Sequence, residues 1–143
     1  MKTVAQLLRV KGTAIHSIRP DASVYECLVL LAEENVGSLL VMEGEKLVGI
    51  LTERDYARKV VLHGKSSKDL KVSEVMSEEV LWVGPESTNE QCMAIMTERR
   101  IRHLPVMESG KVIGLISIGD LVKDIIAEQR FVIDQLEHYI MGR

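Results

Sequence analysis

Two hydrophobic patterns take turns along this chain: short apolar runs, and apolar residues spaced as on one face of a helix. Short apolar runs begin at Ile15 and at Val80, and a proline follows two residues after each run ends, at Pro20 and Pro85. Short runs of this kind, bounded by a turn residue, predict β-strands. The same signal therefore opens two separate stretches of the chain.

A helix is predicted after each proline. Ser23 with Glu26, and Thr88 with Gln91, match the capping box, in which the hydroxyl accepts a first-turn N–H and the second side chain reaches back. Apolar side chains then recur at helical spacing and would face a sheet, while charged residues face solvent. These apolar stripes consist of Val24, Leu28 and Leu31 in the first helix and of Met93 and Met96 in the second.

Two β-runs joined by a glycine-bearing turn follow each helix, and a second helix follows each pair of runs. The predicted hairpins span residues 39–51 and 104–117, and the helices after them span residues 53–63 and 119–129. Each stretch is therefore a β-α-β-β-α unit. A unit of about 60 residues is too small to bury a good core alone, so the two should pack together.

The two units are copies of one another. At an offset of 65 residues, Val36–Asp55 lies over Ile101–Asp120 with seven of twenty positions identical. The sequence thus predicts an α/β (α+β) fold of two β-α-β-β-α units about a pseudo-twofold axis. We expect residues 1–64 as the first unit, 65–71 as a polar linker, 72–128 as the second unit and 129–143 as a C-terminal helical extension. The extension has apolar residues at helical spacing, which should cover the other unit or a partner subunit; they are Phe131, Leu136, Tyr139 and Ile140.

Composition narrows the class of protein. The chain has 143 residues, 46% of them apolar, which is typical of a globular protein. No apolar run approaches the roughly 20 residues of a membrane span and no leader is seen, so we expect a cytoplasmic protein. Cys27 and Cys92 fall in helical patterns and should be buried, without a disulfide or a zinc site. A net charge of −3 disfavours nucleic-acid binding by the whole surface.

The ends of the two hairpins share a motif. Gly49-Ile-Leu-Thr52-x-x-Asp55 returns as Gly114-Leu-Ile-Ser117-x-x-Asp120. Alone, a hydroxyl followed three residues later by a carboxylate is most often a helix cap. Here it occurs twice in register, directly after a strand, with a glycine whose lack of a side chain would let a flat group approach the backbone. The hydroxyl, the free helical N–H groups and the carboxylate would together suit a ribose and its phosphate.

With these residues in place, the chain resembles a pair of CBS domains (cystathionine-β-synthase domains), the Bateman module, over residues 1 to about 128. The family's motif ending is matched at Gly49–Asp55 and Gly114–Asp120, and its hydrophobic-Pro-Val strand start at Leu104–Val106, whereas Leu40 replaces that proline in the first unit. The tail also resembles that of small stand-alone bacterial CBS-pair proteins.

The resemblance implies two related sites for adenosine nucleotides in the cleft between the units. Asp55 and Asp120 would bind the ribose hydroxyls, and Thr52 and Ser117 the ribose or phosphate. The other unit would supply the adenine walls of each site. These walls are Ile15, His16, Val36 and Gly37 for the Asp120 site, and Val80, Leu81, Ile101 and Arg102 for the Asp55 site.

Charge distinguishes the two sites. A phosphate near an aspartate requires a cation, and the candidates are Arg102, His103 and Arg54. The first unit has Gly37 and Ser38 where the second has Arg102 and His103, and Gly119 stands opposite Arg54. We therefore expect two inequivalent sites, with occupancy of one site possible.

No catalytic motif is present in the sequence: no dinucleotide fingerprint, P-loop, HExxH or nucleophile elbow. We expect a regulatory module, not an enzyme, that binds an adenosine nucleotide of the AMP, ATP or NAD(H) class, AMP first, and acts in trans on an unknown effector protein. The resemblance implies a homodimer of four units in a flat ring. The alternative is a structural or dimerisation scaffold without a ligand. A third hypothesis, single-stranded nucleic acid binding through Arg99–His103, lacks aromatic residues beside that cluster.

Overall fold

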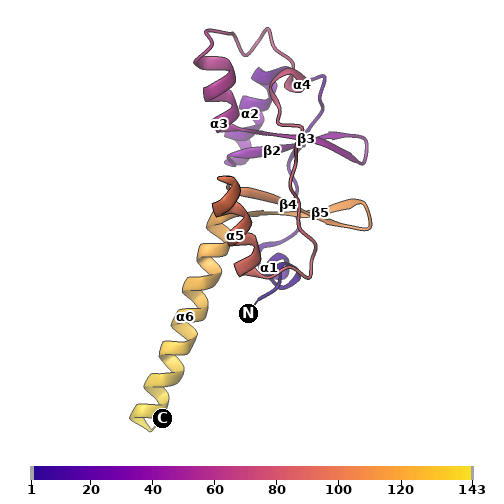
Figure 1. The fold of residues 1–143 in the computed structure, drawn as a ribbon. Coiled ribbons are helices and arrows are strands. Elements are labelled where there is room, and N and C mark those ends of the chain that lie inside the picture. Colours follow the sequence, from indigo (N-terminus) through magenta and orange to yellow (C-terminus); the bar gives the residue numbers. More distant parts are fainter. Residues whose placement is uncertain (1, 143) are drawn as a thin grey trace.

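The computed structural model describes residues 2–142, which form two similar units and a long C-terminal helix (Figure 1). The first unit contains β1 (Ser17–Ile18), α2 (Val24–Glu34), β2 (Ser38–Glu43), β3 (Lys46–Thr52), α3 (Glu53–Tyr56) and the π-helical turn η1 (Ala57–Val61). The second contains α5 (Asn89–Arg99), β4 (His103–Glu108), β5 (Lys111–Ser117) and α6 (Ile118–Met141). Two short helices, α1 (Val4–Lys11) and α4 (Val72–Val75), precede the units in the sequence. The predicted fold class is confirmed.

The two sheets follow one plan with one difference. In the first unit β1 runs parallel to β2, which pairs antiparallel with β3. In the second unit β4 pairs with β5, but the strand predicted at Val80–Val83 is reduced to one bridge between Val83 and Val106. The second sheet lacks this strand because of the residue that the neighbouring strand β4 presents to it. Leu40 donates its N–H to the His16 carbonyl at 3.2 Å, and its counterpart Pro105 has no N–H to donate.

The capping residues read from the sequence begin both long helices of the units. The Ser23 hydroxyl accepts the Glu26 N–H at 3.0 Å. Thr88 and Gln91 form the reciprocal box, with bonds of 2.9 and 3.2 Å. The helices end at Asn35 and Arg100, which adopt left-handed conformations with φ of 53° and 55°. Both helices therefore start and stop at equivalent places in the two units.

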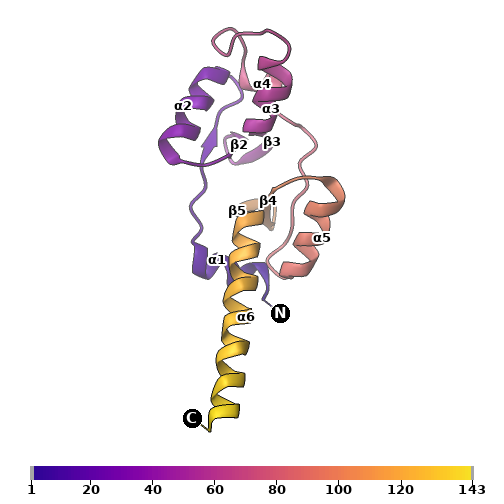
Figure 2. The same cartoon turned by 90° about the vertical axis from the view of Figure 1, so that its left-hand side faces the viewer.

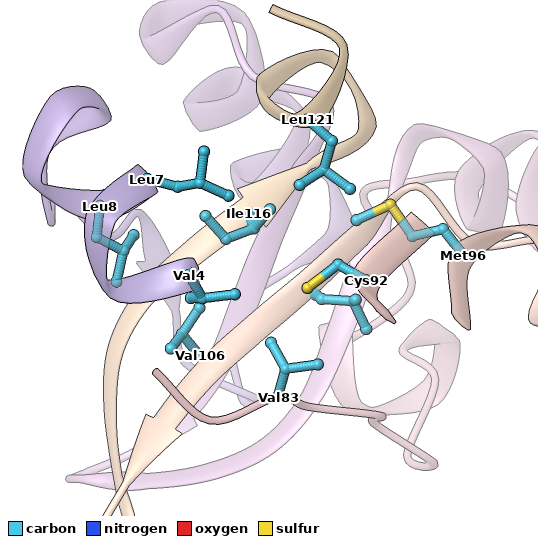
Figure 3. Packing of buried hydrophobic residues seen from close by; sticks show 10 residues of the cluster. Val4, Leu7, Leu8, Val83, Cys92, Met96, Val106, Ile116 and Leu121 are labelled. Carbon is cyan, nitrogen blue, oxygen red and sulfur yellow. The ribbon is translucent and has the colours of Figure 1, made fainter. Parts of the chain in front are cut away.

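Each unit completes its core with a helix from elsewhere in the sequence. Val4, Leu7 and Leu8 of α1 pack in the core of the second unit, beside Ile116 and Leu121 (Figure 3). Val72 and Val75 of α4 pack in the core of the first unit. Backbone bonds fix both exchanges, from the Val4 N–H to the Ser87 carbonyl (2.7 Å) and from the Val72 N–H to the Ala22 carbonyl (2.8 Å). The exchange links the two units through their main chains.

The motif glycines make room for these exchanged segments and not for a ligand. A Cβ on Gly49 would lie 2.6 Å from the Met76 Sδ, and one on Gly114 would lie 2.7 Å from a Leu8 methyl group. The expectation that the glycines expose backbone to a flat ligand is wrong, because side chains of this chain fill that space.

Helix α6 is one continuous helix of 24 residues that leaves the body of the molecule (Figure 2). Leu121 and Asp124, in its first turns, are buried. Ile125 is half-buried, and beyond it the large apolar residues are exposed, Leu136 at 56% and Tyr139 at 86%. The expectation that the extension covers the other unit is therefore wrong. In the described part of the chain, no helix, α6 included, is long and apolar enough to cross a membrane.

Cys27 and Cys92 are buried and unpaired, at equivalent positions of the two cores. Burial raises the pKa of each thiol to about 11, so neither is an exposed thiolate. Their predicted place in the cores is confirmed.

Candidate functional site

Both motif aspartates lie in the first turn of a helix and form a capping box with the N-cap residue, Thr52 or Ser117. The Thr52 hydroxyl accepts the Asp55 N–H and Asp55 Oδ2 accepts the Thr52 N–H, each at 3.1 Å. The Ser117 hydroxyl and Asp120 form the same reciprocal pair, at 3.2 and 2.8 Å. The helix-cap interpretation of the motif is therefore correct. Whether the carboxylates also bind a ligand depends on their remaining contacts.

A cleft of about 490 Å³ lies between the units beside Asp55. The first unit contributes Thr52, Arg54, Asp55 and Gly37, and the second contributes Val80, Leu81, Ile101, Arg102 and His103. All the residues that the sequence assigned to the Asp55 site are thus brought together in one cleft. Gly37, expected at the Asp120 site, lines this cleft instead. Six further residues complete the lining: Ile50, Glu53, Ser77, Glu79, Arg100 and Pro105.

Ser77 is a functional candidate that the sequence did not indicate. Its hydroxyl donates to Asp55 Oδ1 at 3.3 Å, and its backbone pairs with that of Ile50. Lys59, one turn along from Asp55, lies 3.5 Å from the same oxygen and donates to the Val75 carbonyl at 2.9 Å. Ser77 follows α4, which packs against the first unit. The repeat at an offset of 65 residues does not predict this packing.

Arg54 connects the units across the mouth of the cleft. Its guanidinium donates to the carbonyl of Arg100, the residue that ends α5, at 2.8 Å. Arg100 and Arg102 bring two more guanidinium groups to the lining, all three being solvent-exposed. The cleft also contains Glu53, Asp55 and Glu79. Positive and negative side chains are therefore balanced, and the ring of guanidinium groups can meet an anion.

His103 lies between the two halves of the molecule. A Cβ on Gly37 would be 3.9 Å from its Cε1, so the imidazole faces the first unit. Burial, followed by the nearby positive charge of Lys11, lowers the pKa of His103 below 6.5. His103 is thus mainly neutral at pH 7. It can donate or accept a hydrogen bond in the cleft, and its predicted role as a cation for the phosphate stays a prediction.

Asp120 is paired within its own unit. The Lys11 ammonium, at the end of α1, lies 2.5 Å from Asp120 Oδ2 and also donates to the Leu115 carbonyl. Burial acts to raise the pKa of Asp120, but the bonds from Lys11 and Ser117 outweigh it and hold that pKa below 3.8. Lys11, like Ser77, was missed by the sequence because it belongs to an exchanged segment.

Of the other residues expected around Asp120, Ile15, His16 and Val36 lie in the first unit and Gly119 lies in the second. Ile15 and His16 are half-buried at the entrance to β1, where His16 Nδ1 is 3.6 Å from Glu34 Oε2. Val36 lines a separate hollow of about 360 Å³ beside α2. Gly119 stands in the first turn of α6, where an added Cβ would lie 3.6 Å from the Ser117 hydroxyl. Their assignment to a ligand site at Asp120 stays a prediction.

The family model described as the CBS domain matches residues 10–62 and 72–127, so the chain belongs to the family of CBS-domain proteins. CBS pairs are regulatory modules, and the similar proteins include small stand-alone CBS pairs, as the sequence indicated. The chain is 38% identical to the mitochondrial CBS domain-containing protein CBSX3 of Arabidopsis thaliana, over 98% of this chain and 72% of the relative.

Two solved structures extend this similarity to the fold. The CBS domain NE2398 is 56% identical, with a TM-score of 0.85 over 87% of this chain and 98% of that one. A putative signal-transduction protein with CBS domains from Burkholderia ambifaria MC40-6 is 51% identical, with a TM-score of 0.86 over 90% of this chain and 96% of that one. The arrangement of the two units is therefore that of solved CBS pairs.

Proposed function

We propose that this chain is a regulatory module that binds an adenosine nucleotide, of the AMP, ATP or NAD(H) class with AMP first, in the cleft beside Asp55. The single observation that carries the proposal is that cleft of about 490 Å³, which combines a strand-to-helix aspartate with guanidinium groups from both units. The volume is within the range of about 300–1,000 Å³ that small-molecule sites occupy.

Each part of the nucleotide has a suitable partner in the lining. Asp55 would accept the two ribose hydroxyls, replacing the neutral Ser77 hydroxyl on Oδ1. Arg54 and Arg102 would meet the phosphate, because planar guanidinium groups bind phosphate oxygens through two N–H donors. The apolar side chains of Val80 and Ile101 would face the adenine. A ligand held this way touches both units and favours one arrangement of them.

The fold itself is compatible with adenosyl ligands. The CBS pair of MJ0100, which has the same fold at a TM-score of 0.79, was solved in complex with 5′-methylthioadenosine and S-adenosylmethionine. Identity to that chain is 21%, so the comparison concerns the fold and not the individual contacts.

We propose further that the module is not an enzyme and acts in trans on an effector protein, in the cytoplasm, as a homodimer. Among residues 2–142 no group of three or more histidine, cysteine or acidic side chains could hold a metal ion. The exposed apolar residues of α6 supply a surface for a second copy or another protein.

Calorimetric titration with AMP, ATP, NADH and S-adenosylmethionine tests the proposed function. We expect heat of binding and a rise in melting temperature with at least one of them. The Asp21→Ala variant, which removes an exposed aspartate outside the cleft, should bind as the wild type does. No heat and no thermal shift with any of the four would favour the scaffold alternative.

A further inference from the structure

The two units satisfy the same pair of acceptors in different ways. In the first unit Ser77 serves both: its N–H donates to the Ile50 carbonyl at 2.9 Å and its hydroxyl donates to Asp55 Oδ1. In the second unit the Leu115 carbonyl corresponds to that of Ile50, and the second acceptor is Asp120 Oδ2, the oxygen that also accepts the Ser117 N–H. Both accept from the Lys11 ammonium, each at 2.5 Å. The second unit thus uses one lysine to donate to both groups, whereas the first unit uses the neutral Ser77 and keeps the Lys59 ammonium 3.5 Å from Asp55 Oδ1.

This difference changes what a ligand must displace. At Asp55, ribose hydroxyls would replace a neutral hydroxyl bond of 3.3 Å and a lysine at 3.5 Å. At Asp120 they would compete with a charge-assisted bond of 2.5 Å from Lys11 to Oδ2, the oxygen that also caps α6, and such bonds are roughly twice as strong as neutral ones. The two carboxylates are similarly buried, with 14% and 19% of the side chain exposed, so burial does not separate them. The partner does.

The surroundings of Asp120 give a phosphate little support. The first unit has Gly37 and Ser38 where the second has Arg102 and His103, so the wall that would face Asp120 lacks their guanidinium and imidazole groups. Lys11 is the nearby cation, and two of its three N–H donors are used by Asp120 and Leu115.

We propose that Lys11 closes the second site and thereby sets the binding stoichiometry of the module at one adenosine ligand per chain, in the Asp55 cleft. This inference rests on the proposed function, since it concerns the same class of ligand. It makes Lys11 a residue that determines which of the two duplicated sites is open.

A matched control exists at the other end of the same helix. Lys2 pairs with Asp124 at 2.9 Å, so α1 is held to α6 by an ion pair near each of its ends. Replacing Lys2 removes the same charge and loosens the same helix without freeing Asp120. An effect specific to Lys11 is therefore separable from general loosening of α1.

Equilibrium dialysis with adenosine, which carries no phosphate, tests the proposal. Bound adenosine per chain at saturation should rise from one in the wild type to two in Lys11→Met, and should stay at one in Lys11→Arg and Lys2→Met. In the Asp55→Ala background it should rise from none to one when Lys11→Met is added. A cooperative thermal transition confirms that each variant folds, and Lys11→Gln replaces Lys11→Met if the latter does not.

Four results would overturn the inference: two ligands in the wild type, no gain in Lys11→Met, the same gain in Lys2→Met, or no binding in any variant. The last would leave the proposed function standing, because the titration with phosphate-bearing nucleotides tests that function separately. No binding in the wild type with one ligand in Lys11→Met would end the proposal for the Asp55 cleft alone and would support the closure of Asp120 by Lys11.

Discussion

The two oxygens of the Asp55 carboxylate make different hydrogen bonds, and a bound ligand would replace only one of these bonds. Oδ2 accepts the Thr52 N–H and so begins α3, whereas Oδ1 accepts from Ser77 and faces the cleft. A substitution that preserves the first oxygen and removes the charge separates capping from binding. Asparagine does this, because its amide oxygen can still accept the N–H at the N-cap.

We predict that Asp55→Asn and Asp55→Ala both weaken adenosine-nucleotide binding, by about 1.5–3 kcal/mol for each charged hydrogen bond lost. Asp55→Ala should in addition destabilise the fold by about 1 kcal/mol through loss of the reciprocal cap, and Asp55→Asn by less. Titration calorimetry measures the first effect and urea unfolding the second. Unchanged affinity in both variants would show that Asp55 is a cap only.

Some residues of the Asp55 cleft were predicted before the structure was known, and others were not. Val80, Leu81, Ile101 and Arg102 were assigned to one site with Asp55 from the sequence, and they line one cleft with it. The resemblance to CBS pairs implied these positions. Ser77 and Lys11 could not be found this way. Lys11 precedes the first unit in the sequence but bonds to Asp120 of the second, and Ser77 follows α4, before the long helix α5 of the second unit, but bonds to Asp55 of the first.

At the scale of the elements, the exchange of α1 and α4 explains the motif glycines. Each exchanged segment places a side chain directly over a glycine of the facing strand: Met76 over Gly49 and Leu8 over Gly114. The sequence predicted α2, α5, both hairpins and their caps, since these depend on neighbours within a few residues, but it did not predict α1 or α4. It did not predict the exchange, which depends on contacts between residues far apart in the chain.

We predict that Gly49→Ala destabilises the protein by about 1–3 kcal/mol, the usual cost of overpacking a core. The new Cβ would lie 2.6 Å from the Met76 Sδ and 3.0 Å from the Ser77 carbonyl oxygen. At Gly114 the three nearest atoms all belong to the Leu8 side chain, so Gly114→Ala should cost less. Urea unfolding gives both values.

Combining Gly49→Ala with Met76→Ala tests the cause of that loss. If the clash with Met76 dominates, the two substitutions together should cost less than the sum of their separate effects. Additive losses would mean that the backbone near Ser77, and not the methionine, resists the new methyl group.

At the scale of the whole molecule, most of α6 projects from the two units and its apolar side chains have no packing partner among them. Val122, Ile126, Ile133, Leu136 and Ile140 recur along one face with the spacing of a helix that packs against another helix, and all are exposed. The apolar pattern of the tail was visible in the sequence. Its position was not, because nothing local distinguishes a helix that folds back from one that projects.

We predict that the proposed homodimer forms through this face of α6. Replacing Ile133 and Leu136 by glutamate should convert a dimer to a monomer, because two buried apolar contacts per copy become unpaired charges. Sedimentation velocity measures the mass. The melting temperature of the two units should change little, because both residues lie beyond the part of α6 that packs on the body.

Gln135→Glu is the matched control, since it adds a negative charge to the same turn of α6 at a position that is already polar and exposed. This variant should remain a dimer. A wild-type protein that sediments as a monomer would contradict the homodimer itself, and a double variant that stays dimeric would move the interface away from α6. If nucleotide binding also survives in the monomeric variant, the cleft works within one chain, as its lining from both units of a single copy requires.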